Sequence, residues 1–439
     1  MMANDIIKIG DYIVIKKQNY RKLHKLNKPN STIMLGRDSI NLSGVENCPY
    51  YSVFKMILSG NKKSKEYSLE LTDKAINLKD EIGVKISGND NRNIVDDGRS
   101  QKLTATEIED LRVDAYKASD IVETLITNSS TFHNKTEFSQ DKYLKKKEKK
   151  YFEYIQILQP NLRIVAEIMY KLDPNKIQGI RIDTLSQVMS FANVYSEGVH
   201  LLYDSGSNGL MAAALLSAIG TGTSGKLLHM HPGNMSQKQA LLAMNFEADH
   251  LNRCISVNVY SALRQFYQGC DTNDTPSENK SSTLKRKNVD DTETDHKIKV
   301  PRLKNDITED GILSVDCHDN SEQTQSEPKL PKWHFDNIAA SQLMKNKVDS
   351  LVITCKEDPH NIFKELMEFV KPGRPFVIYY PVAEPLQQSY LKLRSFSNVA
   401  ALQITNNWMR NYQVLPERTH PEVMMNGSSG FLLTGYILK

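Results

Sequence analysis

The sequence predicts an α/β protein in which a small β-rich N-terminal domain precedes a larger domain with a parallel sheet. Residues 1–88 contain short strand-like runs separated by turns that are rich in Gly, Asn and Pro. Residues 196–439 alternate apolar strands with helix-like stretches, a pattern typical of βαβ units. Between the two, residues 89–195 contain a polar loop and then a helical, lysine-rich connecting region.

Size and composition exclude several classes of protein. The chain has 439 residues, 39% of them apolar, which is enough for two or three globular domains. The net charge of +4 is too small to indicate a polyanionic partner by itself. The sequence has no run of about 18 apolar residues and no signal-peptide order, so we expect a soluble, intracellular protein without membrane contact. The five cysteines form no CxxC pair, and we expect reduced thiols at Cys48, Cys254, Cys270, Cys317 and Cys355.

In the N-terminal region, strands are predicted at residues 12–15, 32–35 and 51–54. Turn residues separate these runs, so we predict a small antiparallel sheet or barrel. After a polar loop at residues 88–101, Thr104 or Thr106 can cap a helix that begins near Glu107.

The connecting region contains a dense cluster of lysines. Seven lysines oppose three carboxylates, a local net charge of +4, and they are Lys135, Lys142, Lys145, Lys146, Lys147, Lys149 and Lys150. Apolar residues recur at helical spacing at Leu144, Tyr151, Ile155 and Leu158. A helix here would bury that stripe and leave the lysines on its exposed flank. Lysines four residues apart repel one another and destabilise a helix. So dense a cluster favours a bound polyanion, such as a nucleic-acid phosphate backbone, that compensates the repulsion. The alternative is that the lysines only form the solvated face of a helix.

The C-terminal region is predicted to form seven strands, at residues 199–203, 225–230, 254–259, 349–354, 375–380, 399–405 and 430–438. Helices are predicted at residues 208–219, 236–246, 361–370 and 385–396. A Rossmann core extended by a long last strand pair is typical of class I methyltransferases. Residues 271–331 are crowded with polar residues and almost free of aromatic ones, so we expect a disordered insertion in this domain.

The turn after the first strand of this domain bears on cofactor binding. A class I methyltransferase ends that strand in an acidic residue followed by a glycine-rich turn that lies against S-adenosylmethionine. The turn here contains Asp204, Gly206 and Gly209, but Asn208 stands where the pattern requires glycine. The Asn208 side chain should then project toward the space that the cofactor fills. We therefore predict a degenerate cofactor site.

Two further strands lack residues that the cofactor requires. The second strand offers His229 and His231 where a carboxylate should bind the ribose hydroxyls, and neutral imidazole cannot provide a bidentate, charged grip. No Asp-x-Pro group follows the fourth strand closely, and Asp358-Pro359 is more simply a turn before a helix. We expect no catalytic residue and no bound cofactor in this chain; a Rossmann domain that binds another ligand is the alternative.

A second candidate surface for nucleic acid lies near the C-terminus. Trp408 and Tyr412 flank Arg410 and Asn411, and aromatic rings can stack on unpaired bases while arginine contacts phosphate. A core or subunit-interface position is the alternative for the two aromatic residues. The small residues after Asn426, beginning with Gly427, would let RNA approach the backbone, or they form a plain hairpin loop.

Basic clusters at residues 284–287 and 297–304 lie inside the expected insertion. An accessible basic cluster is the form of a nuclear import signal, although a generic basic linker has the same composition. On this basis we expect a location in the nucleus.

Five stretches together resemble one protein family. They are residues 101–104, 135–139, 181–185, 410–421 and 430–435. In these stretches the chain is similar to the Gcd10-like family, the non-catalytic subunits of the eukaryotic tRNA 1-methyladenosine methyltransferase, which modifies an adenine in the tRNA T-loop. The similarity covers nearly the whole chain outside the insertion.

The resemblance implies a heterotetramer of two such chains with two catalytic methyltransferase subunits, with S-adenosylmethionine on the catalytic partner and tRNA as the substrate. It maps RNA-binding residues onto Asn91, Arg92, Asn93, Arg99, Gln101, Lys102, the seven lysines of the cluster, Arg181, Trp408, Arg410, Asn411, Tyr412, Asn426 and Gly427. The implied function is to bind tRNA and support the catalytic subunit. An active RNA methyltransferase that uses S-adenosylmethionine and a protein-interaction scaffold without RNA contact are the alternatives.

Overall fold

A computed structural model describes most of the chain. The described residues are 6–36, 38–59, 66–73, 88, 100–113, 118–151, 153–269, 331–414, 419–423 and 425–438. Four predicted RNA-binding residues, Asn91, Arg92, Asn93 and Arg99, lie outside them, as does the expected insertion except for Pro331. The side chains of Lys145, Lys149 and Lys150 also lie outside the description.

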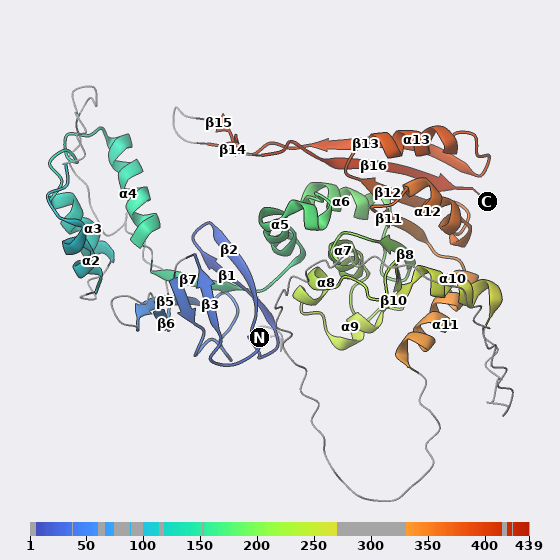
Figure 1. Cartoon of the computed structure of the whole chain (residues 1–439), viewed down its shortest axis with the longest axis horizontal. Helices are drawn as coiled ribbons and strands as arrows, with labels where there is room; N and C mark the ends of the chain where they lie inside the picture. The colour runs from blue at the N-terminus through green and yellow to red at the C-terminus, as the bar shows by residue number, and fades with distance from the viewer. Residues whose placement is uncertain are drawn as a thin grey trace, which may run out of the picture.

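The N-terminal region forms a curved, barrel-like sheet (Figure 1). Its strands are β1 (Tyr12–Lys17), β2 (Tyr20–Lys25), β3 (Thr32–Leu35), β4 (Asp38–Asn41), β5 (Val53–Leu58), β6 (Glu66–Thr72) and β7 (Tyr154–Leu158). Their order is β2-β1-β7-β5-β6-β4-β3, with all neighbours antiparallel except β4 and β6. Side chains such as Ile13, Phe54 and Ile157 fill its core, so the predicted small β-rich domain is confirmed.

Strand β7 corrects one prediction about the lysine-rich region. Ile155 and Leu158 were expected on the lysine helix, but they lie in β7, between β1 and β5 of the N-terminal sheet. Half-buried and buried side chains alternate from Tyr154 to Ile157, as they do in a strand with one face on a core. The isolated spacings of four and three residues fit a helix equally well, which is why the sequence pattern misled.

A small helical unit is inserted between β6 and β7. It contains α2 (Ala105–Val113), α3 (Ala118–Thr127) and α4 (Glu137–Tyr151), packed around a core that includes Val122, Phe132 and Leu144. The cap expected at Thr104 or Thr106 is at Thr104. Its Oγ1 accepts from Glu107 N (3.3 Å) while Glu107 Oε2 accepts from Thr104 N (2.8 Å), a reciprocal capping box.

The C-terminal domain contains the seven predicted strands. They are β8 (Val199–Asp204), β9 (Lys226–His231), β10 (Cys254–Asn258), β11 (Ser350–Thr354), β12 (Arg374–Tyr380), β13 (Val399–Trp408) and β16 (Ser428–Ile437). Their order is β10-β9-β8-β11-β12-β16-β13. The first five are parallel, and β16 is antiparallel to both of its neighbours. This order is that of a class I methyltransferase sheet, with the reversal between β8 and β11 at the switch point where such folds bind ligands.

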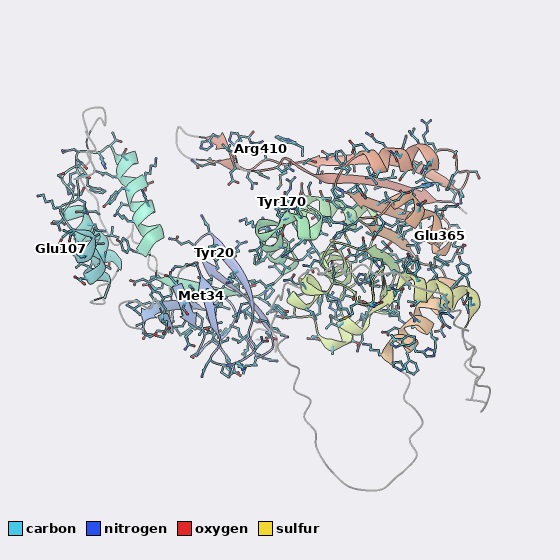
Figure 2. All side chains as sticks on the ribbon, viewed as in Figure 1. Tyr20, Met34, Glu107, Tyr170, Glu365 and Arg410 are labelled. Atoms are coloured by element: carbon cyan, nitrogen blue, oxygen red, sulfur yellow. The ribbon has the colours of Figure 1, made fainter. Side chains whose placement is uncertain are left out.

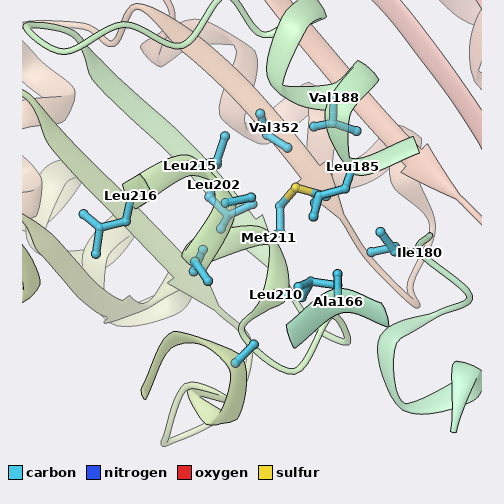
Figure 3. Packing of buried hydrophobic residues seen from close by; sticks show 14 of the residues in the cluster. Ala166, Ile180, Leu185, Val188, Leu202, Leu210, Met211, Leu215, Leu216 and Val352 are labelled. Atoms are coloured by element: carbon cyan, nitrogen blue, oxygen red, sulfur yellow. The ribbon is translucent and has the colours of Figure 1, made fainter. Parts of the chain in front are cut away.

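Helices cover both faces of this sheet (Figure 1). One face is covered by α5 (Leu162–Leu172), α6 (Ile182–Phe191), α7 (Leu210–Ile219) and α8 (Gln239–Ala243). The other is covered by α10 (Val259–Gln268), α11 (Lys332–Lys345), α12 (Pro359–Leu366) and α13 (Glu384–Leu393). Figure 3 shows the first layer, where Met211 of α7 packs among Leu185 and Val188 of α6 and Leu202 of β8. The sequence had predicted α7, α8, α12 and α13, whereas it placed the residues of α5 and α6 in the helical connecting region before this domain. Helices α10 and α11 were not predicted, and α10 begins directly at the end of β10 with Asn258 as its cap.

Polar contacts and an apolar cluster that includes Val14 of β1 and Ile168 of α5 join the N-terminal sheet to the C-terminal domain. The backbone of Tyr12 in β1 exchanges two hydrogen bonds with the side chain of Asn245, at 2.8 and 2.7 Å. Arg21 in β2 forms an ion pair with Glu167 of α5 (2.8 Å). In the part of the chain that the structure describes, no helix is long and apolar enough to cross a membrane.

Candidate functional site

The glycine-rich turn after β8 is held together by its own acidic residue. Asp204 Oδ1 accepts hydrogen bonds from Gly206 N (3.0 Å) and Ser207 N (2.8 Å), and Oδ2 accepts a short one from the Ser207 hydroxyl. The Ser207 hydroxyl oxygen also accepts from Met211 N at the start of α7 (3.1 Å). Asp204 is buried and its carboxylate is engaged in closing the strand–turn–helix. The degenerate loop therefore still folds as a methyltransferase loop does.

The space over this turn is occupied by the chain itself. A Cβ on Gly206 would lie 2.5 Å from Gln178 Nε2 and 2.6 Å from Lys356 Cε, so these two side chains lie directly against the glycine. Gly209, with φ +78°, is covered by the Gln237 carbonyl oxygen, which a Cβ would meet at 2.8 Å. In a methyltransferase, the glycines keep this space open for the cofactor. Here they accommodate protein atoms.

Asn208 lies in the left-handed region with φ 55°, which asparagine tolerates better than most residues. Its side-chain amide donates to Gln239 Oε1 (2.6 Å) at the start of α8. Asn208 was expected to obstruct the cofactor space. The structure instead gives it a bridge from the turn to α8, and Gln178 and Lys356 cover Gly206.

The end of β9 has a neutral, buried lining in place of a carboxylate. His229 Nδ1 lies 3.3 Å from Ser256 Oγ, and Nε2 lies 4.0 Å from Asp204 Oδ2. Burial lowers the pKa of His229 and outweighs the opposing field of Asp204, so the imidazole is neutral and the 4.0 Å approach is no ion pair. Burial also lowers the pKa of His231. Neither ring offers the charged acceptor that ribose hydroxyls require.

A cavity of about 510 Å³ remains beside the covered turn. It lies at the carboxyl ends of β11 and β12, and it is bounded by α5, by the short helix η1 (Pro174–Ile177) and by the start of β16. Tyr170, Gln178, Lys356 and Tyr380 are among its lining residues, and Figure 2 labels Tyr170 at the end of α5. None of these four residues was predicted from the sequence as part of a site. Only Lys356 had a positional signal, because it follows the fourth strand.

Arg181 lies beneath the surface, unlike the other predicted RNA-binding residues that the structure describes. It is 5% exposed and makes a bidentate pair with Asp183, at 2.7 and 2.8 Å. Its remaining donors reach the carbonyl oxygens of Asn426 (2.7 Å) and Gly427 (3.0 Å). Arg181 thereby ties the turn before β16 to the start of α6. These hydrogen bonds give Arg181 a structural role. They do not test the predicted contact of Arg181 with RNA.

The C-terminal aromatic residues lie on a projecting ribbon. Beyond the sheet, the chain continues from β13 into β14 (Tyr412–Gln413), which pairs with β15 (His420–Pro421), and Figure 1 shows this ribbon extending away from the C-terminal domain. Trp408 is 69% exposed and Tyr412 is 54% exposed, so a core position is wrong for both. Arg410, which Figure 2 labels on this ribbon, is half-buried.

The turn at Asn426 and Gly427 meets the base of this ribbon. Asn426 is exposed, and a Cβ on Gly427 would lie 2.6 Å from Trp408 Nε1, so the indole packs directly on the glycine. The structure thus brings Arg181, Trp408, Asn426 and Gly427 together. Asn411 and Tyr412 are exposed farther along the ribbon.

The lysine helix belongs to the helical unit of the N-terminal domain. Gln140, Leu144 and Tyr151 of α4 are buried, whereas Lys142 and Lys146 are exposed, so these two lysines face away from the core as predicted. Lys147 Nζ lies 5.1 Å from the centre of the Tyr143 ring. Of the flanking predicted residues, Lys102 is exposed, Lys135 is half-buried and Gln101 donates to Leu125 O (3.0 Å).

Comparison with known proteins identifies the family. The model of the Gcd10p family matches residues 6–298, and the tRNA (adenine(58)-N(1))-methyltransferase non-catalytic subunit TRM6 of Mus musculus is 31% identical over 99% of this chain and 89% of its own. The chain belongs to the Gcd10p family. The resemblance drawn from the sequence is therefore confirmed.

Other relatives of this Gcd10p family chain have the same description. The non-catalytic subunit trm6 of Dictyostelium discoideum is 30% identical over 99% of this chain and 80% of its own. That of Schizosaccharomyces pombe is 24% identical over 79% of this chain and 75% of its own. Their description as non-catalytic subunits agrees with the prediction that this chain is not itself the methyltransferase.

Among solved structures, the chain is similar to a SAM-dependent O-methyltransferase of Thermotoga maritima, with 14% identity, a TM-score of 0.48 and coverage of 99% of this chain and 96% of that one. It is also similar to the tRNA (m1A58) methyltransferase TrmI of Aquifex aeolicus, with 11% identity, a TM-score of 0.45 and coverage of 99% of both chains.

Proposed function

We propose that this chain is the substrate-binding, non-catalytic subunit of a tRNA methyltransferase that forms 1-methyladenosine in the T-loop. It binds tRNA and supports a catalytic subunit, which binds S-adenosylmethionine. One observation supports this most: the turn that binds the cofactor in class I methyltransferases keeps its fold while Gln178 and Lys356 cover it. Its relatives' description as non-catalytic subunits of a tRNA methyltransferase points the same way.

Electrostatics also disfavours the cofactor in this chain. S-adenosylmethionine contains a positively charged sulfonium, and the Lys356 side chain lies against Gly206. The carboxylate that would bind the ribose is replaced by two histidines whose pKa values are lowered by burial. We therefore propose that the chain binds no cofactor, and that its Rossmann fold serves assembly and RNA binding.

Two surfaces are proposed to contact tRNA. The first is the exposed face of α4, where a lysine-rich segment with a local net charge of +4 can neutralise phosphates. The second is the ribbon with Trp408, Arg410 and Tyr412, which combines exposed rings with a guanidinium. Both surfaces extend beyond the compact parts of the two domains (Figure 1).

Assembly and location are also proposals. The family resemblance supports a heterotetramer with two copies of each subunit, in which the catalytic subunit is a class I methyltransferase. Basic clusters at residues 284–287 and 297–304, outside the described residues, support a location in the nucleus.

Reconstitution tests the function. The chain is purified alone and together with its catalytic subunit, and each sample is assayed for methyl transfer to tRNA, with the mass of the complex measured in parallel. We expect transfer only from the complex. Transfer by the chain alone would establish an active enzyme instead. If substitution of the α4 lysines and of the ribbon residues leaves the tRNA affinity of the complex unchanged, the chain is a scaffold without RNA contact.

A further inference from the structure

The cavity beside the covered turn has the size and the position of a ligand site. Its volume of about 510 Å³ lies inside the range of about 300–1,000 Å³ that small-molecule sites occupy. It opens at the carboxyl ends of β11 and β12, the edge at which doubly wound sheets bind ligands. The covered glycine turn lies to one side of it, so its occupant need not be the cofactor of the fold.

A buried amide lies at the inner side of this cavity. Gln178 is 7% exposed, and its Oε1 and Nε2 are buried without a hydrogen-bond partner among the described residues. Its backbone has φ 54° and is held by the Tyr379 hydroxyl, which donates to Gln178 O (2.7 Å). Burying an amide with both groups unpaired is costly. The amide now lies against Gly206, and its rotation into the cavity would let a ligand that presents an acceptor beside a donor pair with both groups. The edge of a nucleobase presents that pair.

The walls of the cavity fit the rest of a nucleotide. Tyr170 and Tyr380 are half-buried lining residues, and aromatic rings stack on unpaired bases. Lys356 is exposed at the rim and supplies a positive charge for phosphate. The same charge disfavours a cationic ligand such as S-adenosylmethionine.

The position of the cavity favours RNA as the source of the nucleotide. Asn426, Ser428 and Gly430 line it, and the same turn packs against Trp408 at the base of the exposed ribbon. An RNA strand that follows the ribbon would therefore pass the opening of the cavity.

We infer that this cavity binds one unpaired nucleotide of the bound RNA, with its base against Tyr170 and Tyr380 and its edge on Gln178. The inference rests on the proposed RNA-binding function and adds a specific contact to it. On this inference the cavity binds an RNA nucleotide beside the covered turn, at which class I methyltransferases bind their cofactor.

The test uses the complex of this chain with its catalytic subunit and measures tRNA affinity by filter binding. Tyr380→Leu removes the ring, whereas Tyr380→Phe keeps the ring and removes only the hydrogen bond from its hydroxyl to Lys356 O (3.2 Å). Loss of one base stack should weaken affinity by about fivefold or more in Tyr380→Leu. Tyr380→Phe should bind as the unaltered complex does.

Ultraviolet crosslinking of the unaltered complex with tRNA gives a second measurement that is independent of how the variants fold. We expect a nucleotide attached to the peptide that contains Tyr170 or Tyr380, at a position of the tRNA that is unpaired. Unchanged affinity in Tyr380→Leu without such a crosslink overturns the inference. So does S-adenosylmethionine binding by the isolated chain that Tyr380→Leu abolishes. If lysine variants also leave affinity unchanged and nothing crosslinks anywhere on the chain, the proposed function itself fails.

Discussion

Replacing Arg181 with alanine should destabilise the C-terminal domain strongly, because it removes a buried guanidinium with four hydrogen bonds to Asp183, Asn426 and Gly427. Breaking a buried ion pair by removing one partner costs about 3–5 kcal/mol. Asp183 is 19% exposed, so water can solvate the carboxylate that is left, and we expect the lower end, about 3 kcal/mol. In a domain of this size that lowers the melting temperature by about 6–12 °C.

The assay is a thermal melt of the purified chain followed by intrinsic fluorescence. The matched control is Arg163→Ala, which removes an arginine whose side chain is 78% exposed and whose pair with Glu167 contributes at most about 1 kcal/mol. Arg181→Lys keeps the charge but not the two-pronged geometry, so it should melt between the wild type and Arg181→Ala. A melting temperature for Arg181→Ala equal to that of Arg163→Ala would refute the structural role. Weakened tRNA binding with unchanged melting would make Arg181 a direct RNA ligand.

Three further predictions concern charge, cofactor and pH. Reversing Lys142 and Lys146 to Glu should weaken tRNA binding by the complex and reduce the slope of log affinity against log salt by about 1.5. The control Lys392→Glu, on α13, should leave that slope unchanged. A slope for the Lys142 and Lys146 variant equal to that of the unaltered complex would exclude α4 from the RNA surface. S-adenosylmethionine should not shift the melting temperature of the isolated chain. The test uses a concentration about 100 times a micromolar Kd, at which binding would stabilise the folded chain by about 2.7 kcal/mol. A clear upward shift would show that the chain still binds the cofactor. His200 and His229 are buried with lowered pKa values, so the folded state binds fewer protons than the unfolded one and stability should fall as pH drops below about 6.5. His229→Gln should flatten that fall in pH-dependent melts, and a steeper or unchanged fall would contradict the assignment.

Much of the C-terminal fold could be predicted because buried parallel strands are nearly continuous apolar runs. The strands β8 and β11 are of this kind, and the structure places them at the expected residues. Strand β7 could not be predicted in the same way. Its partners β1 and β5 lie far away in the sequence, and its apolar residues also fit the helical spacing of the preceding lysine segment.

The position of the candidate site could be predicted from the sequence, but the side chains that cover it could not. The turn at Asp204 could be located from its residues, whereas the cover provided by Gln178 depends on a left-handed backbone and on a hydrogen bond from Tyr379 in another strand. Such a contact has no local sequence pattern. Arg181 was found by resemblance as an RNA ligand, although Asp183 two residues later was a local indication of its ion pair.

We propose that this chain contributes RNA binding but no chemistry, and methyl transfer to tRNA tests this proposal most directly. The assay compares the chain alone, the catalytic subunit alone and the complex, each with tRNA and S-adenosylmethionine. We predict transfer by the complex, none by this chain alone, and loss of transfer by the complex at limiting tRNA when Lys142 and Lys146 are reversed. Methyl transfer by this chain alone would contradict the account.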